Sequence, residues 1–263
     1  MSDPVWRLII DGQQPGAANM AIDRAMLAAR REGSSPATLR LYRWKCPTVT
    51  VGHFQRLEQV DLTACARRGF DVARRPTGGR GVLHDDELTY CVVAHVEDGV
   101  PRGVAASYRH LSAALAEAYR TLGVEAELTQ RSLGESGSGA CYLHATQADL
   151  SLGAAKLSGS AQVWGGDAVL QHGSFVRTRD VEAEAEVFRL GKRGRDSLAS
   201  STATLADALG TAPSLDAVRD AVVEAFERTM GVRLEPGVLT SEESAHAAAF
   251  RPDHEVSRES ANL

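Results

Sequence analysis

The feature that most constrains the fold is the uneven distribution of strand-like and helical patterns along the chain. Short apolar runs with strand character lie almost entirely before Val176, whereas the last third shows the helical spacing of apolar residues. A regular alternation of strands and helices would indicate a doubly wound parallel sheet. The uneven order favours an α+β fold, in which a mixed, largely antiparallel sheet packs with helices.

The expected elements are short segments bounded by turn residues. Strands are expected at Val5–Ile10, Thr38–Trp44, Thr48–Val51, Phe70–Arg74, Glu87–His95, Leu157–Trp164 and Asp167–Val176. The last two flank Gly165 and Gly166, a pair that predicts a two-residue hairpin. Helices are expected at Gly16–Arg31, from the N-cap Asp61 to Gly69, and at Val104–Leu122, Leu215–Met230 and Thr240–Phe250.

One domain boundary is indicated by composition. Gly, Lys, Arg and Ser cluster at Gly191–Ser200, which predicts a linker. We therefore expect a main α/β domain over residues 1–190 and a helical extension over residues 191–263 that packs on it. The polar tail Arg251–Leu263 has the composition of a disordered segment. The Ser/Gly-rich segment Gln130–Gly139 has the composition of a mobile loop.

Charge and hydropathy exclude several classes of protein. The net charge of −5 argues against non-specific nucleic-acid binding, which needs a basic surface. No apolar run approaches the roughly 20 residues of a membrane helix. The first residues also lack the pattern of a signal peptide. We therefore expect a cytoplasmic protein that binds neither nucleic acid nor membranes.

The four cysteines differ in their surroundings. Their spacing contains no CxxC pair, so no metal site is expected, and disulfides are rare in a reducing cytosol. Cys46, Cys65 and Cys91 lie in strand or helix patterns and fit buried structural residues. Cys141 follows the Ser/Gly-rich segment, where a side chain is more exposed. A nearby cation would raise the thiolate fraction of such a thiol, whose ordinary pKa is about 8.5.

Three other segments carry chemistry-bearing residues. The stretch Arg74–His84 holds glycines that let a ligand approach the backbone, and arginines suited to a phosphate or carboxylate. Its spacing matches neither a Walker A loop nor GxGxxG, and a plain turn with solvated arginines fits it equally well. Lys156 is either a solvated residue at a strand edge or a cation that points into a site. His172 is either a general base or a satisfied core residue.

Four motifs in this order resemble the lipoate-protein ligase and octanoyltransferase superfamily, which shares its catalytic fold with biotin-protein ligases. They are RRPTGGRGVLHDDELTY at Arg74–Tyr90, KLSGSAQ at Lys156–Gln162, LQHGS at Leu170–Ser174 and LRLYRWKCPTVTVGHFQ at Leu39–Gln55. The resemblance spans about Trp6 to Phe250. It implies a biotin/lipoate-protein ligase-like catalytic domain, with substrate-binding residues Arg75, Thr77, Gly78, Gly79, Arg80, Gly81, His84, Ser158, Gly159, Ala161, His172 and Gly173.

Within this superfamily, the chain is most similar to the octanoyltransferases of Gram-positive bacteria. In that type the nucleophilic cysteine precedes the lysine by 15 residues, and Cys141 and Lys156 have the same separation. The other octanoyltransferase type has the lysine first. Two departures are the missing Asp-Ala-Pro run after Cys141 and the different C-terminal tail.

The resemblance implies catalysis by Cys141 and Lys156 without a cofactor. The octanoyl group would pass from acyl carrier protein to the cysteine, and then to a lysine of a lipoyl domain or of the glycine-cleavage H protein. Two alternatives stay open. One is an ATP-dependent lipoate-protein ligase that uses ATP and Mg and forms lipoyl-adenylate, and the other is a non-catalytic binder of acyl groups or carrier proteins.

Overall fold

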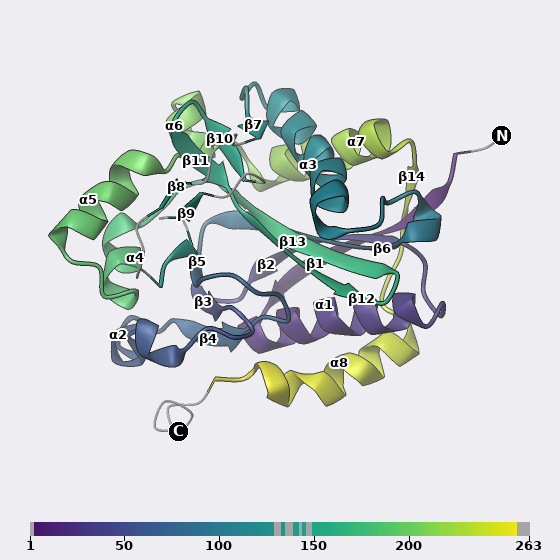
Figure 1. Cartoon of the computed structure of the whole chain (residues 1–263), viewed down its shortest axis with the longest axis horizontal. Helices are drawn as coiled ribbons and strands as arrows, with labels where there is room; N and C mark the ends of the chain where they lie inside the picture. Colours follow the sequence, from purple (N-terminus) through teal and green to yellow (C-terminus); the bar gives the residue numbers. More distant parts are fainter. Residues whose placement is uncertain (1–2, 129–132, 135–138, 142–143, 146–148, 257–263) are drawn as a thin grey trace.

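A six-stranded mixed sheet forms the centre of the computed structural model, which describes residues 3–128, 133–134, 139–141, 144–145 and 149–256 (Figure 1). The spatial order of its strands is β12 (Ser160–Gly165), β13 (Ala168–Val176), β6 (Glu87–His95), β2 (Thr38–Trp44), β1 (Val5–Gln14) and β14 (Arg233–Pro236). Among the first four strands each neighbouring pair is antiparallel, whereas β1 is parallel to both of its neighbours. The predicted α+β fold with a mixed, largely antiparallel sheet is confirmed.

Helices cover both faces of this sheet. Helices α3 (Val104–Thr121) and α7 (Leu215–Met230) pack on one face, and α1 (Gly16–Arg31) packs on the other (Figure 1). Helix α8 (Ser241–His254) lies against α1 as an outer layer. Neighbouring residues of a strand point to opposite faces. Val92 of β6 accordingly belongs to the core under α3 and α7, while Val93 belongs to the core under α1.

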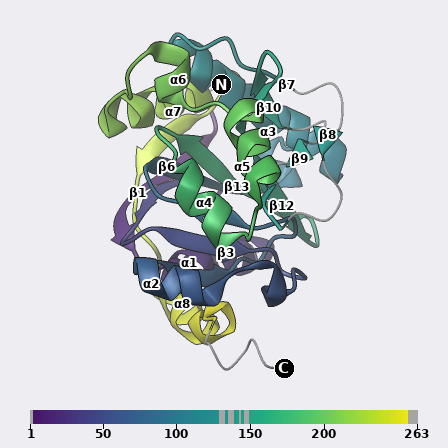
Figure 2. The same ribbon diagram turned by 90° about the vertical axis from the view of Figure 1, so that its left-hand side faces the viewer.

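A smaller three-stranded sheet stands beside the main one. Its central strand β3 (Thr48–Val51) is parallel to β4 (Asp71–Arg74) and antiparallel to β5 (Val82–His84). It shares a hydrophobic core with α2 (Leu62–Arg68), α4 (Val181–Val187) and α5 (Lys192–Ser201). Helices α4 and α5 lie at the left end of the molecule in Figure 1, and in Figure 2 this end faces the viewer. The Gly-rich loop, residues 75–81, joins β4 to β5.

The remaining elements are short. An antiparallel sheet contains β11 (Ala155–Ser158), β10 (Leu150–Leu152) and β7 (Glu127–Leu128). A two-stranded ribbon pairs β8 (Leu133–Gly134) with β9 (His144–Ala145). The other short elements are the helix α6 (Leu205–Leu209) and the 3₁₀ turns Leu57–Gln59 and Val96–Asp98.

Several predicted elements occur with the expected bounds: Gly16–Arg31, Thr38–Trp44, Thr48–Val51, Glu87–His95 and Leu215–Met230. The predicted cap of α2 is also confirmed. The Asp61 carboxylate accepts a hydrogen bond from the amide of Ala64 at 2.9 Å, and Gly69 ends the helix at a φ of 72°.

The hairpin region differs from its prediction. The expected strand Leu157–Trp164 is divided at Gly159 into β11 and β12, which belong to different sheets. The two-residue turn consists of Gly166 and Asp167, since Gly165 still pairs with Ala168. The pattern could not show the division because both halves of the segment alternate as strands do.

The C-terminal third holds two more corrections. The expected linker at Gly191–Ser200 is mostly helix α5, because Leu198 is fully buried in the core of the smaller sheet. Strand β14 was not expected. The boundary between residues 1–190 and 191–263 stays a prediction. Helix α8 extends to His254, so the start of the predicted disordered tail is helical, and residues 257–263 lie outside the described residues. Most of Gln130–Gly139 also lies outside them, and its residues Leu133–Gly134 form β8.

Candidate active site

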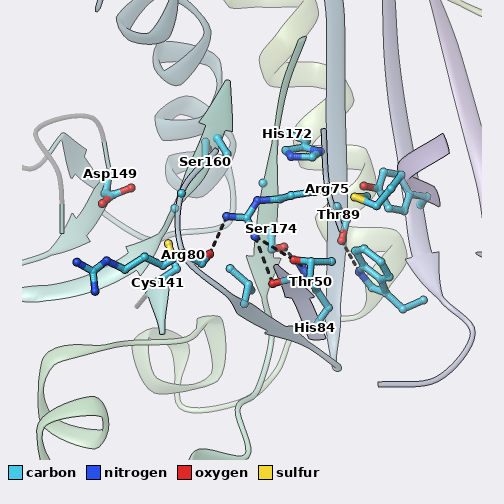
Figure 3. Close-up of a pocket in the computed structure, with 18 of the residues that line it drawn as sticks. Thr50, Arg75, Arg80, His84, Thr89, Cys141, Asp149, Ser160, His172 and Ser174 are labelled. Atoms are coloured by element: carbon cyan, nitrogen blue, oxygen red, sulfur yellow. Dashed lines mark hydrogen bonds between the residues drawn. The ribbon is translucent and has the colours of Figure 1, made fainter. Parts of the chain in front are cut away.

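A cavity of about 230 Å³ lies where the Gly-rich loop faces the strands β11–β13 (Figure 3). Cys141, Arg80 and Asp149 lie at one side of it, and His84 and Thr89 lie at the other. Its apolar lining is contributed by the side chains Met20, Tyr42, Trp44, Val82 and Ala161. The cavity is far larger than the roughly 10–15 Å³ that one water needs, so it can hold a ligand of several atoms.

The structure brings the two predicted catalytic residues together at this cavity. The ammonium nitrogen Nζ of Lys156 lies 3.8 Å from the sulfur of Cys141 and 3.3 Å from its carbonyl oxygen. The same nitrogen lies 2.9 Å from a carboxylate oxygen of Asp149. Lys156 and Asp149 are each only 3% exposed. Thiol, ammonium and carboxylate therefore form one compact cluster.

Backbone contacts with Gly81 hold the cysteine in place. The amide of Cys141 donates to the carbonyl of Gly81 at 2.7 Å, and the amide of Gly81 donates to the carbonyl of Gly139 at 2.9 Å. The side-chain amide of Gln55 donates to the same Gly139 carbonyl at 3.0 Å. The ring of Phe188 fills the space where a Cβ of residue 81 would stand. Only glycine therefore fits here without moving the ring.

Lys156 is held in a position that favours its charged form. Burial lowers the pKa of the Lys156 ammonium, but the negative charges of Cys141 and Asp149 raise it more, and the balance lies above the ordinary value. Gly159 leaves room for this arrangement, since a Cβ there would stand 3.2 Å from Nζ. The lysine therefore points into the site, and its interpretation as a solvated edge residue is wrong.

Asp149 was not among the sequence candidates. It immediately precedes β10, the strand that pairs with β11, so its contact with Lys156 depends on the antiparallel pairing of the two strands. A single acidic residue beside an apolar run carries no sequence signal of that kind. Phe188, which packs on Gly81, was missed for the same reason.

The two arginines at the start of the Gly-rich loop shape the loop itself. The buried guanidinium of Arg75 donates to the carbonyls of Thr50 at 3.3 Å, Gly78 at 2.9 Å and Arg80 at 2.6 Å. Burial lowers the pKa of Arg75, and the negative charge of Cys141 opposes that effect. The neighbouring Arg74 donates to the carbonyls of residues 52, 53 and 55. Both guanidinium groups therefore contact backbone carbonyls, whereas the sequence indicated a phosphate or carboxylate as their partner.

His172 has hydrogen-bond partners on both ring nitrogens. Its Nδ1 lies 2.9 Å from Asp23, and its Nε2 lies 2.7 Å from the hydroxyl of Thr77. Burial lowers the pKa of His172, which favours the neutral ring, and the hydrogen bond to Asp23 opposes this. Burial raises the pKa of the Asp23 carboxyl, but the hydrogen bonds and charges of His172 and Arg40 lower it by more, so the balance lies below the ordinary value. His172 therefore fits the interpretation as a core residue, since both ring nitrogens have hydrogen-bond partners. Its ring lines the cavity.

His84 also has partners on both nitrogens, Thr50 at 2.9 Å and Glu87 at 2.6 Å, and it stacks on Trp44 with ring centroids 4.2 Å apart. Burial would raise the pKa of Glu87, but the charge and hydrogen bond of His84 lower it, as do the hydroxyls of Ser174 and Thr89. This polar group stands at the end of the cavity opposite Cys141 (Figure 3).

Most of the predicted substrate-binding residues line the cavity: Arg75, Gly79, Arg80, His84, Gly159, Ala161, His172 and Gly173. Four others stand behind the lining. Thr77 holds His172, Gly78 accepts from Arg75, Gly81 holds Cys141, and the Ser158 hydroxyl donates to the carbonyl of residue 174. These four act on the lining residues.

Metal-binding clusters and membrane-spanning helices are both absent from the described residues. Among them, no group of three or more His, Cys, Asp or Glu side chains is arranged to hold a metal ion. None of the helices in the same part of the chain combines the length and the apolar character that crossing a bilayer requires.

Known proteins share both the sequence and the fold of this chain. Residues 15–227 match the lipoyl protein ligase A/B catalytic domain. The octanoyltransferase LipM of Kyrpidia tusciae is 40% identical over 251 residues, covering 90% of this chain and 92% of the relative. LipM of Moorella thermoacetica is 38% identical, covering 95% and 96%. A crystal structure of lipoate-protein ligase A bound with ATP superposes with a TM-score of 0.78 at 25% identity, covering 96% and 95%.

These matches agree with the geometry of the site. They cover nearly the whole chain, including the Gly-rich loop, the cysteine and the lysine. The predicted superfamily and the predicted ligase-like catalytic fold are both confirmed. The chain belongs to the lipoyl protein ligase A/B catalytic-domain family.

Proposed function

We propose that this protein is an octanoyltransferase of lipoate biosynthesis that carries the octanoyl group as a thioester on Cys141. The observation that carries the proposal is the distance of 3.8 Å between the sulfur of Cys141 and the buried ammonium of Lys156, at the cavity. The acyltransferase class agrees with the names of the relatives. The donor in this proposal is octanoyl-acyl carrier protein.

In the first step the Cys141 thiolate, stabilised by the ammonium of Lys156, attacks the thioester carbonyl of the donor. A carbon–sulfur bond forms to Cys141, and the bond to the carrier's sulfur breaks. The carrier leaves as a thiolate and takes a proton from solvent. One thioester replaces another, so the step is close to thermoneutral and needs no ATP.

In the second step a neutral lysine amine of a lipoyl domain or of the glycine-cleavage H protein attacks the acyl-enzyme. The carbon–nitrogen bond of an amide forms, the bond to Cys141 breaks, and the amine's proton passes to solvent. An amide is more stable than a thioester, so this step runs downhill. The ammonium of Lys156 then faces a thiolate again, which favours departure of the cysteine.

Both steps pass through an oxyanion that needs hydrogen-bond donors. The amides of Gly81 and Cys141 already donate to backbone carbonyls, so they do not serve. Among the residues that the structure describes, the ammonium of Lys156 is a donor that lies close to the reacting sulfur. The octanoyl tail occupies the apolar part of the cavity, where burial gives about 0.8 kcal/mol per CH₂.

The alternative is an ATP-dependent ligase, in which Lys156 contacts the phosphate of an acyl-adenylate. The carboxylate of Asp149, 2.9 Å from the lysine nitrogen, would repel a phosphate placed there. The same carboxylate is compatible with a neutral thioester. The cluster therefore supports the transferase over the ligase.

The test is to incubate the protein with octanoyl-acyl carrier protein, without ATP, and to measure intact masses before and after hydroxylamine. We expect an octanoyl adduct that hydroxylamine removes and that the Cys141→Ser variant lacks. Cys46→Ser is the matched control, because Cys46 is also a partly exposed free thiol and lies outside the cavity lining. Lipoylation that requires ATP and survives Cys141→Ser would instead establish the ligase. If neither reaction occurs, the protein is a binder.

A further inference from the structure

The amine of Lys156 can itself accept the acyl group. Its nitrogen lies 3.8 Å from the sulfur that carries the acyl group in the proposed function. A thioester carbonyl carbon is bonded directly to that sulfur, so the nitrogen and the carbonyl carbon are neighbours. Reactions between groups held so closely reach effective concentrations of about 10⁵ M or more. Even a small fraction of neutral lysine would then be acylated.

Acylation also removes one of the two charges that keep the lysine protonated. Before the reaction, Lys156 contacts the thiolate and the carboxylate of Asp149. A thioester is neutral, so among the described residues in contact with Lys156 the Asp149 carboxylate, at 2.9 Å, is then the negative partner. Lys156 is 3% exposed, and burial favours the neutral amine. Its protonation at this stage therefore depends on Asp149.

We propose that Asp149 keeps Lys156 protonated while Cys141 carries the acyl group, and so prevents the enzyme from acylating its own lysine. The inference rests on the proposed function. In the side reaction the neutral nitrogen of Lys156 bonds to the acyl carbon, the carbon–sulfur bond breaks, and the proton of the amine passes to the released thiolate. The product is an amide on Lys156 that no acceptor can remove, so the enzyme is inactivated.

Other titratable groups facing the cluster do not replace the carboxylate. Arg75 is positive and disfavours a second positive charge. Tyr90 and Tyr108 have pKa values raised by burial, so both stay neutral at physiological pH. Within the part of the chain that the structure describes, Asp149 is thus the group that can hold the ammonium after acylation.

The test uses the Asp149→Asn variant, which keeps the shape of the side chain and removes its charge. A small octanoyl thioester in excess loads Cys141, and peptide mass spectrometry after hydroxylamine locates any stable octanoyl amide. We expect the amide fraction on Lys156 to rise at least about tenfold over wild type, the response to losing about 1.4 kcal/mol of charge stabilisation. Asp149→Glu should restore the wild-type fraction. Asp98→Asn is the control, since it breaks another carboxylate pair, with Arg30, away from the cavity.

The outcomes separate the inference from the function on which it rests. If wild-type protein forms no labile adduct, the proposed function fails. If wild type loads and Asp149→Asn loads without forming the amide, only the inference fails. A folded Asp149→Asn that loads nothing also overturns it, because the carboxylate would then be needed for loading. Wild-type acyl-enzyme held without acceptor should lose its thioester mainly to water, and a wild-type amide fraction on Lys156 as large as that of Asp149→Asn would contradict the inference.

Discussion

The contact between Gly81 and Phe188 predicts that one added methyl group will disturb the reactive cysteine. In Gly81→Ala the new Cβ would overlap the ring of Phe188, with the ring carbon Cζ 2.8 Å away, and it would stand 3.3 Å from the carbonyl of Gly139. Phe188 is 3% exposed, so its ring cannot swing into solvent. Overpacking of this kind costs about 1–3 kcal/mol.

Strain at this position reaches Cys141 directly, because Gly81 makes two backbone hydrogen bonds to residues 139–141. A shift of about 1 Å in a reacting group can lower a rate roughly 100-fold. We therefore expect Gly81→Ala to lower the rate of Cys141 acylation by up to about 100-fold. The urea midpoint should fall by roughly 0.3–1 M, taking an m-value of about 3 kcal/mol per M.

The assay compares loading rates by intact mass with urea unfolding of the same preparations. Gly12→Ala is the matched control, since a Cβ there meets nothing within 4 Å and Gly12 lies in β1 outside the cavity lining, and it should load like wild type. Adding Phe188→Leu to Gly81→Ala should recover most of the loading rate, because the smaller leucine side chain leaves room for the Cβ of residue 81. Normal loading and stability in Gly81→Ala, or no recovery in the double variant, would refute the steric argument.

Three other predictions concern stability and positioning. Burial lowers the pKa of His172 below 6.5, so the unfolded chain binds a proton at this ring more readily than the folded chain. The free energy of unfolding, measured in urea, should therefore decrease as the pH falls below about 6.5. The His172→Gln variant should show a smaller decrease. Arg7→Met leaves Glu243 buried without its ion-pair partner and should cost about 3–5 kcal/mol, most of which Glu243→Leu should restore in the double variant. Gln55→Leu removes a donor to the carbonyl of Gly139 and should slow thiol loading roughly tenfold at unchanged KM, whereas a change in KM alone would contradict a positioning role.

The elements that the sequence predicted well are those that present many apolar residues to a core. Helix α1 has the predicted bounds because its buried residues recur at helical spacing, and strand β6 because it is an apolar run that is buried along almost its whole length. Helix α5 was mistaken for a linker because only Leu198 is buried in it, and one residue defines no period. Strand β14 is short and contains Pro236, so local propensity does not indicate a strand.

The candidate site was predictable where its residues lie within a motif. Cys141 and Lys156 were identified from a resemblance that includes their spacing, and the structure places them in contact. Asp149 and Phe188 were missed because their roles arise from strand pairing and packing between distant segments. The interpretation of Arg75 as an anion ligand did not anticipate its carbonyl partners, since hydrogen bonds to backbone leave no trace in composition.

The pairing of β14 with β1 has a consequence for how the protein folds during synthesis. Val5 lies opposite Arg233 in the register, so β1 and β14 pair only after residues 233–236 have been made. Contacts between such distant residues slow folding, because a long loop must close before they form. The nascent sheet therefore has β1 as an open edge until β14 has been made. During that interval the exposed strand could pair with another chain, and a chaperone would be most useful then.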